Sequence, residues 1–223
     1  GAAGSKLAIA QSGNVGIGNT NPAATLEVGT LTSGSTGNVI INSEGGNPPA
    51  LQVKSRTNRA RINVQDNDTS GYIIAEGSVL SIGFADALSA NNINITNSHN
   101  VGIGTTSPVA KFQVDHAGID AYSVNTSATS AAQVDTFSAT DFRSARFTVQ
   151  ITNTTDSTYQ ITEILLIHDG TTPSMTEYST IFTGSAAEAT FDADIVSGNV
   201  RLLATPASAD SMQFKVVRHS ILV

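Results

Sequence analysis

Apolar and polar residues alternate along most of this chain in short runs, which turn-forming residues separate. The run at 60–65 alternates strictly, and the runs at 72–75 and 79–82 flank Glu76 and Gly77 as the two arms of a hairpin. A period of two places successive side chains on opposite faces of a β-strand. Further short strands are expected at 39–41, 51–53 and 93–95, with a turn at 45–49. The pattern therefore predicts an all-β chain.

One segment of the sequence occurs twice. Residues 12–28 and 98–114 are identical at ten of 17 positions without gaps, at an offset of 86 residues, as between Asn14 and Asn100. Internal repeats are typical of extended structures whose units associate because no single unit can bury its apolar face. We therefore expect residues 1–116 to form a repeat-containing, β-stranded shaft.

Each copy of the repeat places branched apolar residues on one face of a strand and glycine on the other. Val15 and Ile17 alternate with glycines, and so do Val101 and Ile103. Glycine inside a strand often marks the close approach of another backbone. One interpretation is that these four apolar residues form an interchain core between chains wrapped around a common axis, in which the glycines admit the neighbouring chain. The other interpretation is an ordinary strand–turn–strand unit within a single β domain.

Alternation becomes longer and stronger after residue 141. Six or more strands follow, and Ser197, Gly198 and Asn199 form a hairpin turn between two of them. The run at 161–167 is almost continuously apolar, as for a strand that is covered on both faces. This pattern predicts a C-terminal β-sandwich or jelly-roll head at 141–223. The Ser/Thr/Ala-rich segment at 117–140 is expected to be a connector, or else to hold the first strand of the head.

The composition favours association between copies of the chain. Charged residues make up 13% of the 223 residues and aromatic residues 5%, and cysteine and tryptophan are absent. So few large side chains give a thin core, whereas ordering the backbone costs roughly 1–2 kcal/mol per residue. Burial of additional surface between copies is the simplest compensation. Together with the repeat, this deficit predicts an elongated shaft in which copies of the chain associate, followed by the head.

Charge and hydropathy argue against several classes of protein. The formal net charge of −7 and a pI of about 4.9 are unlike those of a nucleic-acid-binding protein, which normally has a basic patch. No run of 18 apolar residues predicts membrane insertion. No basic segment followed by an apolar one predicts a secretory signal. Because the sequence begins with Gly1, we expect a fragment, a processed product or the ordered part of a longer chain.

Candidate metal sites are few, and each has a structural alternative. His99 and His116 would bind a metal only if they met their symmetry mates on a threefold axis; otherwise they are solvated or hydrogen-bonded histidines. Residues 66–71 resemble the first half of a calcium loop, but Gly77 stands where the bidentate glutamate belongs. A hairpin turn explains the same residues.

Candidate catalytic and receptor-binding residues are equally sparse. Asp192 and Asp194 share one face of a strand, whereas a glycosidase needs two carboxyl groups across a cleft. The loop at 168–172 is either a simple turn or a point of contact with a receptor. We therefore predict no catalytic, cofactor-binding or metal site, and the receptor-binding residues stay unassigned.

The second copy of the repeat resembles an element of bacteriophage tail-fibre and related virion structural proteins. Residues 100–108 read NVGIGTTSP and are followed by KFQV at 111–114, which is similar to the NVGIGTTxPxxxLxV element of that family. The first copy departs from this element at Asn19 and Asn21. The part of the chain from about residue 123 is similar to terminal domains of structural proteins from marine cyanobacterial phages.

This resemblance implies a virion location, homotrimeric assembly and a role in host attachment. Its implied partners are other tail or baseplate proteins and a host surface glycan. The catalytic Ser and Lys of the family's self-cleaving chaperone domain have no counterpart that we can place in this sequence. The expected function is therefore that of a non-enzymatic tail fibre. A decoration or fibre protein of the capsid or collar, and a glycan-cleaving tailspike, are the alternatives.

Overall fold

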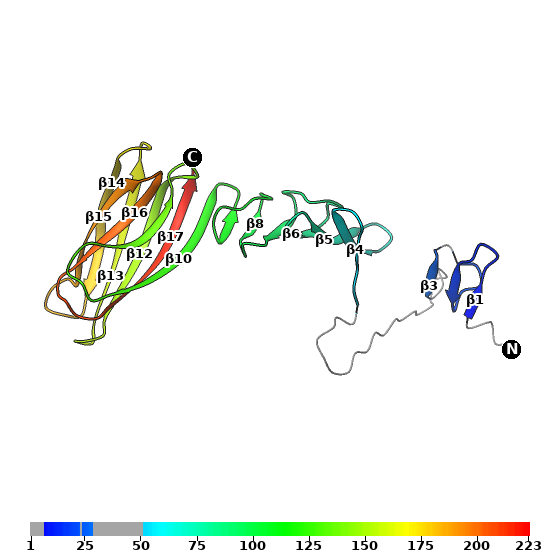
Figure 1. The fold of residues 1–223 in the computed structure, drawn as a ribbon, viewed down its shortest axis with the longest axis horizontal. Helices are drawn as coiled ribbons and strands as arrows, with labels where there is room; N and C mark the ends of the chain where they lie inside the picture. Colours follow the sequence, from blue (N-terminus) through cyan, green and yellow to red (C-terminus); the bar gives the residue numbers. More distant parts are fainter. Residues whose placement is uncertain (1–6, 23, 29–50) are drawn as a thin grey trace. The chain divides into compact units, whose positions relative to one another are not determined.

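The described part of the chain is built from strands. The computed structural model describes residues 7–22, 24–28 and 51–223, and the chain divides into two compact units, 1–53 and 54–223 (Figure 1). Within the described residues there are seventeen strands and no helix, so no helix there could cross a membrane. The all-β fold class predicted from the alternation is confirmed.

The first unit holds a three-stranded sheet made from the first copy of the repeat. β1 (Leu7–Ile9) pairs antiparallel with β2 (Val15–Ile17), which pairs in parallel with β3 (Leu26–Val28). The Asn14 side-chain amide donates a hydrogen bond to the carbonyl oxygen of Pro22 at 3.1 Å. This bond holds the turn that brings the chain back to the start of β2, as a parallel pair requires.

One eleven-stranded sheet organises the second unit, in the order β14-β13-β12-β17-β10-β9-β8-β7-β6-β5-β4. Six of its strands form the part that we call the stem: β4 (Arg59–Gln65), β5 (Ser70–Glu76), β6 (Val79–Gly83), β7 (Ile93–Thr96), β8 (Val101–Ile103) and β9 (Phe112–Val114). The other five belong to the head: β10 (Ala117–Thr126), β12 (Phe142–Asn153), β13 (Thr158–His168), β14 (Pro173–Phe182) and β17 (Met212–Leu222). Neighbouring strands are antiparallel except for β8 and β9.

The head is a two-layer sandwich. A small sheet in the order β11-β16-β15 covers one face of the head strands: β11 (Ala132–Ser138), β15 (Ala189–Val196) and β16 (Asn199–Pro206) (Figure 1). Phe147 of β12 and Phe214 of β17 are fully buried in the same apolar core as Val200 and Leu202 of β16. Interdigitation of the two inner faces is what stabilises such a sandwich. The predicted C-terminal sandwich is therefore observed, with β12 to β17 as its six expected strands.

A buried ion cluster joins the two layers of the head. The guanidinium of Arg218 on β17 lies 2.7 Å from an oxygen of Asp135 on β11 and 2.6 Å from an oxygen of Asp120 on β10, and it stacks over the ring of Phe137. Burial raises the pKa of the Asp135 carboxyl above its ordinary value, against the opposing attraction of Arg218. A charge in such a position is tolerated only when partners surround it.

The sequence repeat is also a structural repeat. β7, β8 and β9 pair in the same order and register as β1, β2 and β3, with every position 86 residues further along. The bond from Asn100 to the Pro108 carbonyl, at 3.0 Å, reproduces the bond from Asn14 to Pro22. The structural unit is longer than the sequence motif, because it also includes β1 and β7.

The glycines of the repeat make room for a turn of their own chain. A Cβ atom added at Gly102 would lie 2.9 Å from the carbonyl oxygen of Thr105, and one added at Gly16 would overlap the carbonyl of Asn19. The turn that follows each strand folds back over the glycine. The interpretation that these glycines admit a neighbouring chain is therefore wrong at Gly16 and Gly102, because residues of the same chain occupy that space.

The short strands predicted before the second copy have mixed outcomes. The hairpin at 72–75 and 79–82 is confirmed as β5 and β6, and the runs at 60–65 and 93–95 lie in β4 and β7. The run at 51–53 is not a strand, and its residues Leu51 and Val53 are exposed. The strand expected at 39–41 and the turn expected at 45–49 lie outside the described residues.

The segment at 117–140 belongs to the head. It contains β10, which pairs with β17 along its whole length, and β11, which forms an edge of the small sheet. Val134 and Phe137 of β11 enter the core. Of the two interpretations of this segment, the one in which it holds a strand of the head is correct. The interpretation as a connector is wrong.

Strand β13 is covered on only one face by its own chain. Ile164 and Leu166 are buried in the head core, but Ile161, Leu165 and Ile167 on the other face are about half exposed. The expectation that this strand is covered on both faces is therefore not met by the described residues of a single chain.

The close contact at Gly102 makes a direct prediction. Replacing Gly102 with alanine should destabilise the full chain by about 2 kcal/mol, because the added methyl group forces the 105–108 turn away from β8. Gly71→Ala is the matched control, because its Cβ would meet no atom closer than 3.8 Å, and it should change stability by at most about 0.5 kcal/mol. Urea unfolding followed by circular dichroism measures both, and equal effects of the two variants would contradict the packing described.

The ion cluster in the head makes a second prediction. Arg218→Leu should destabilise the chain by about 3 kcal/mol or more, because it leaves the Asp135 carboxylate buried without its partner. Arg61→Leu is the control, since Arg61 forms an exposed ion pair with Asp86, and it should cost about 1 kcal/mol or less. The same unfolding measurement separates them. A loss for Arg218→Leu as small as that for Arg61→Leu would show that the cluster does not join the layers.

Candidate interaction surface

The exposed face of the stem carries two rows of apolar residues. Strand pairing aligns the first row across all six strands: Ile62, Ile73, Ile82, Ile93, Ile103 and Val114. The second row is Ala60, Ala75, Leu80, Ile95, Val101 and Phe112. We call these two rows the isoleucine face. Six side chains of the first row, with Leu80 and Phe112 of the second, are each 39–46% exposed.

The four residues predicted as an interchain core lie on this type of face. Val101 and Ile103 belong to the isoleucine face, and Val15 and Ile17 hold the equivalent positions in the first unit. Leu7, Ile9 and Leu26 share the face of Val15 and Ile17 and are 60–73% exposed. Both copies of the repeat thus present the same kind of apolar surface, which is partly exposed to solvent. Contact of these four residues with another chain stays a prediction.

On the opposite face of the stem, one row of residues from β5 to β9 is buried, and it is mostly polar. Ile74 of β5 is followed across the sheet by Ser81, Asn94, Gly102 and Gln113, one on each of the strands β6 to β9. All five residues are almost completely buried. The loops that follow β6 and β8 fold over this row.

Amide side chains hold these loops against the sheet. Asn94 donates to the carbonyl oxygens of Ser89 at 2.8 Å and Thr105 at 2.9 Å. Gln113 accepts a hydrogen bond from the amide of Val109 at 2.8 Å and donates to the carbonyl of Asp115 at 2.8 Å. Loop backbone that is shielded from water needs such partners. The buried asparagine and glutamine therefore replace the strand pairing that these loops lack.

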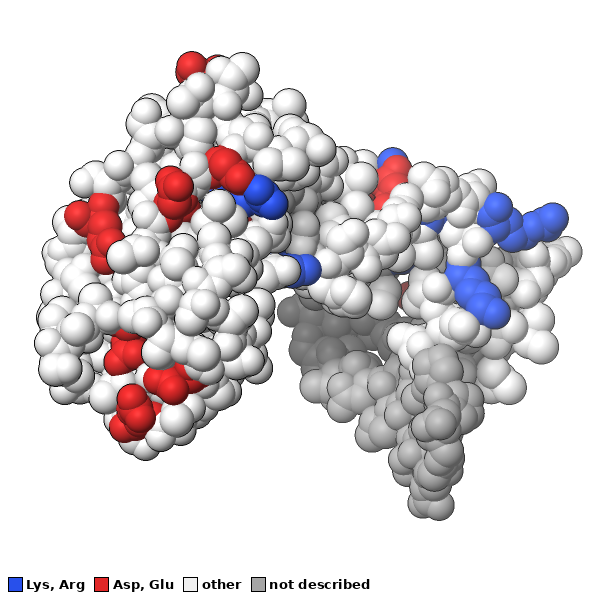
Figure 2. Space-filling model, turned by 60° about the vertical axis from the view of Figure 1, so that its left-hand side comes forward, with Lys and Arg blue, Asp and Glu red and all other residues white. Residues whose placement is uncertain are grey.

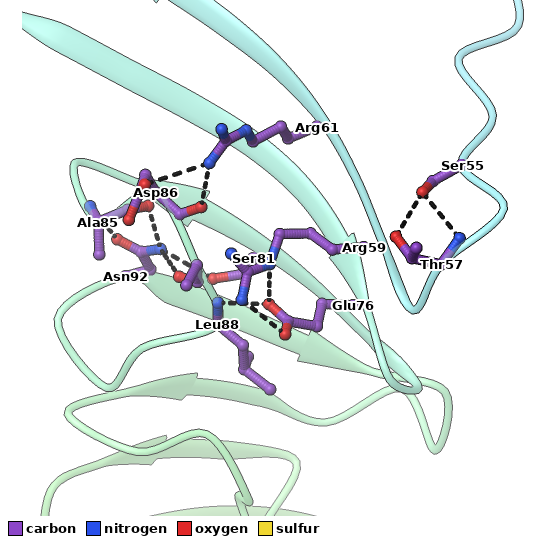
Figure 3. Close-up of polar contacts among 11 residues, drawn as sticks. Ser55, Thr57, Arg59, Arg61, Glu76, Ser81, Ala85, Asp86, Leu88 and Asn92 are labelled. Atoms are coloured by element: carbon purple, nitrogen blue, oxygen red, sulfur yellow. Dashed lines mark hydrogen bonds and ion pairs between the residues drawn. The ribbon is translucent and has the colours of Figure 1, made fainter.

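Asn92 performs the same task at the end of the loop after β6 (Figure 3). Its side-chain amide donates to the hydroxyl of Ser81 at 2.9 Å and to the carbonyl of Ala85 at 3.2 Å, while its oxygen accepts from the Ala85 amide at 3.0 Å. A Cβ atom at Gly83 would overlap this side chain. Gly83 is therefore the position that lets Asn92 reach into the covered face.

Ion pairs complete this covered side near β4. Arg59 makes two parallel hydrogen bonds to Glu76, at 2.8 and 2.9 Å, and the amide of Leu88 donates to the same carboxylate at 2.9 Å (Figure 3). The Arg59 guanidinium, helped by the Leu88 amide, lowers the pKa of the Glu76 carboxyl below its ordinary value. Arg61 pairs with Asp86 at 3.1 Å. These ion pairs and the hydrogen bond from Leu88 thus hold the loop at 84–92 against β4 and β5.

The stem buries its polar side and exposes its apolar side, which is the reverse of what water favours for a single chain. Antiparallel sheets that contact water on one face normally place polar residues there. The eight large side chains of the isoleucine face together expose roughly 600 Å², whereas soluble monomers rarely expose a contiguous apolar patch of more than a few hundred Å². This face is therefore the candidate interaction surface of the described chain.

The two carboxylates considered for catalysis are engaged in local structural bonds. Asp194 accepts a hydrogen bond from Nε of Arg201 at 2.7 Å, and this pairing lowers the pKa of the Asp194 carboxyl. Asp192 accepts one from the amide of Ala193 at 2.8 Å. Asp194 thus serves as an ion-pair partner across β15 and β16.

The loop at 168–172 is a hydrogen-bonded turn. His168 is buried, with Nε2 2.7 Å from the carbonyl oxygen of Phe142 and Nδ1 accepting from the amide of Gly170 at 3.0 Å. The carboxylate of Asp169 accepts from the amides of Thr171 and Thr172, and these bonds lower the pKa of Asp169 to about 2. The side chains considered for receptor contact are thus used to shape the turn.

The residues considered for metal binding are also separate or engaged. Asp66 accepts hydrogen bonds from the amides of Asp68 and Thr69 in the turn between β4 and β5, and these bonds lower its pKa. His99 is exposed in a left-handed backbone conformation, with φ of 63°, and His116 is exposed as well. Among the described residues, no three His, Asp or Glu side chains gather where they could hold a metal ion.

Negative charge is concentrated in the head. Residues 117–223 contain eleven Asp or Glu and five Lys or Arg, a formal net charge of −6. Figure 2 shows carboxylates spread over the visible surface of the head, whereas Lys and Arg gather toward the stem. This charge makes the head surface unfavourable for polyanions such as nucleic acid.

The comparisons with known proteins assign this chain to no family. No family model matches it, and no curated protein matches it. Among solved structures, the tailspike protein of Acinetobacter baumannii phage AM24 aligns with a TM-score of 0.32 and 7% identity over 48% of this chain and 26% of that one. The tailspike protein of Acinetobacter phage vB_ApiP_P1 aligns with a TM-score of 0.27 and 18% identity, over 45% and 20%. This chain thus matches about a quarter or less of either structure, and likeness at this level assigns no function.

The turn at Asp169 predicts a pH dependence. Because its folded pKa of about 2 lies below the ordinary value of 3.8, the carboxylate stabilises the fold above pH 4 and loses that contribution as the pH falls toward 2. Titration by carbon NMR should find the low pKa. Asp169→Ala, which leaves the threonine amides without an acceptor, should destabilise the chain at pH 7 and much less at pH 2. A normal pKa for Asp169 would contradict the turn described here.

Proposed function

We propose that this protein is a structural virion protein, a homotrimeric phage tail fibre that contributes to attachment to the host cell. The observation that carries the proposal is the isoleucine face of the stem, together with the equivalent apolar face of the first copy of the repeat, because the described residues of one chain leave both partly exposed. The resemblance of the repeat to the NVGIGTTxP element of tail-fibre proteins supports the same assignment.

Association of chains covers a sheet with one apolar face, and the resemblance of the repeat to trimeric fibre proteins favours a threefold arrangement. Three such sheets, each turned with its isoleucine face inward, enclose an apolar interior and leave the loop-covered polar faces outward. Val101 and Ile103 then lie in the interior, and Val15 and Ile17 do so in the first unit. Burial of apolar surface supplies about 25 cal/mol per Å², which the thin core of one stem lacks. The trimer is therefore part of how the stem folds.

Attachment is assigned to the loops of the head. Loops on a rigid β scaffold are where binding residues concentrate, because they change without disturbing the core. Three heads on one fibre bind the same cell surface together, so that weak single contacts add up to a high overall affinity. We propose a host surface glycan as the ligand and other tail or baseplate proteins as the structural partners.

The assembly is tested by native mass spectrometry of the full chain. The expected mass is three times the 23.0 kDa of one chain. Ile93→Asp should shift the protein toward monomer, because it places a charge on the isoleucine face, whereas Asn97→Asp adds the same charge in an exposed turn and should leave the trimer intact. A wild-type protein that stays at 23.0 kDa at micromolar concentration would remove the basis of the proposal.

The role in attachment is tested by binding of the fluorescently labelled chain to a panel of marine cyanobacterial cells. The trimer should bind at least tenfold more strongly than the Ile93→Asp monomer, because three heads act together. Immunogold labelling of particles would distinguish a tail fibre from a protein of the capsid or collar. Release of oligosaccharides when the chain is incubated with host surface polysaccharide would overturn the non-enzymatic assignment in favour of a tailspike.

A further inference from the structure

An apolar groove lies on the outer face of the head, the face that the small sheet does not cover. Its volume is about 690 Å³, and its walls come from β10, β12, β13, β14 and β17. Its apolar lining includes Ile119, Leu165, Ile167 and Ile221, and the last three are 47–59% exposed. Arg146 and His219 stand between them on the same face.

The groove continues the isoleucine face. Strand pairing carries the first row of the stem from Val114 to Ala117 of β10, Ile221 of β17, Ser144 of β12 and Ile167 of β13. The second row continues from Phe112 to Ile119, His219, Arg146 and Leu165. The head and the stem belong to one hydrogen-bonded sheet. The two rows therefore continue from β4 to β13, with polar residues at Ser144 in the first row and at His219 and Arg146 in the second.

Apolar character on this face of the head decreases next to those rows but does not end there. The next row along the same strands is Ala121, Val217, Thr148 and Glu163. The row after it holds Ser123, Lys215 and Gln150 and ends with Ile161 of β13 and Ile181 of β14, which are 42% and 68% exposed. The exposed isoleucine and leucine side chains of the two rows that continue the stem indicate that another surface covers these rows.

The surface area supports a second copy as the occupant. In a trimer each chain meets two neighbours, and a standard interface buries about 800 Å² of each partner. The isoleucine face of the stem offers roughly 600 Å² of exposed side chain. The four groove residues add roughly 400 Å² in the same two rows. The exposed side chains of the stem alone are smaller than one standard interface, and the groove brings the total for the two rows to roughly 1,000 Å², which is more than one such interface.

We infer that the groove is an interface between copies of this chain, filled by the neighbouring protomer of the proposed trimer. The inference rests on the proposed function, since it needs the trimer, and it adds that the heads pack together along β10, β13 and β17. Ile167 and Leu165 are then buried in the assembly. The receptor-binding surface is confined to the rest of the head, which includes the outer face of the small sheet and the polar rows of the large one.

Single-cysteine variants test this arrangement, because the natural chain contains no cysteine. Ile167→Cys places a thiol in the groove, and Ile93→Cys places one on the isoleucine face of the stem. Thr190→Cys is the control, because it places a thiol at an exposed position of β15. Native mass spectrometry records the assembly of each variant, and the rate of reaction with maleimide records the accessibility of its thiol. Leu165→Cys serves in place of Ile167→Cys if that variant does not assemble.

The expected result is a trimer in which the thiols at 167 and 93 react at least tenfold more slowly than the thiol at 190. Dissociation by dilution should bring the first two rates up to that of the third. A trimer with a protected thiol at 93 and a freely reactive one at 167 would overturn the inference and leave the proposed function standing. A 23.0 kDa monomer with all three thiols reactive would overturn both.

Discussion

The structure depends on a sheet that its own chain covers on one side only. In the stem, the loops after β6 and β8 lie over the row from Ile74 to Gln113 and hold it with amide hydrogen bonds. No described segment lies over the other side, where Ile73, Ile93 and Ile103 remain half exposed. Every further property of the stem follows from this asymmetry, because a face of branched apolar side chains is stable only when it is removed from water.

The head solves the same problem within a single chain. Its small sheet covers the inner face of β12, β13 and β17, and the Arg218 cluster joins the two layers. Such a sandwich has its own core and is expected to fold without a partner. The stem has almost no apolar core of its own among the described residues, and Ile74 is its one fully buried large apolar side chain. In the proposed assembly, neighbouring chains would supply to the stem the burial that the small sheet supplies to the head.

The sequence predicted which residues alternate, but not which side of a strand would be covered. Alternation places Val101 and Ile103 on the face opposite Gly102, and this much is independent of the tertiary structure. The glycine is buried because a turn of the same chain crosses it, and no period in the sequence reveals where a turn will fold. β10 and β11 were obscured because Ser, Thr and Ala alternate weakly, although Val134 and Phe137 supply the core contacts. The groove escaped prediction because it joins residues of five strands that only the sheet order brings together.

The repeat controls the register on which the apolar rows depend. A register shift of one residue in any strand pair would move its apolar residue to the loop-covered face of the sheet. It would also move a polar residue to the isoleucine face. In each copy, the Asn bond to the Pro carbonyl and the turn packed on the glycine hold the parallel pair in one register. The Asn, Gly and Pro of the motif therefore act on the opposite side of the sheet from the apolar residues that they align. In the proposed assembly, an apolar row can contact a neighbouring chain along its length only when every strand contributes to the row in register. This requirement would account for the recurrence of these turn residues together with Val and Ile.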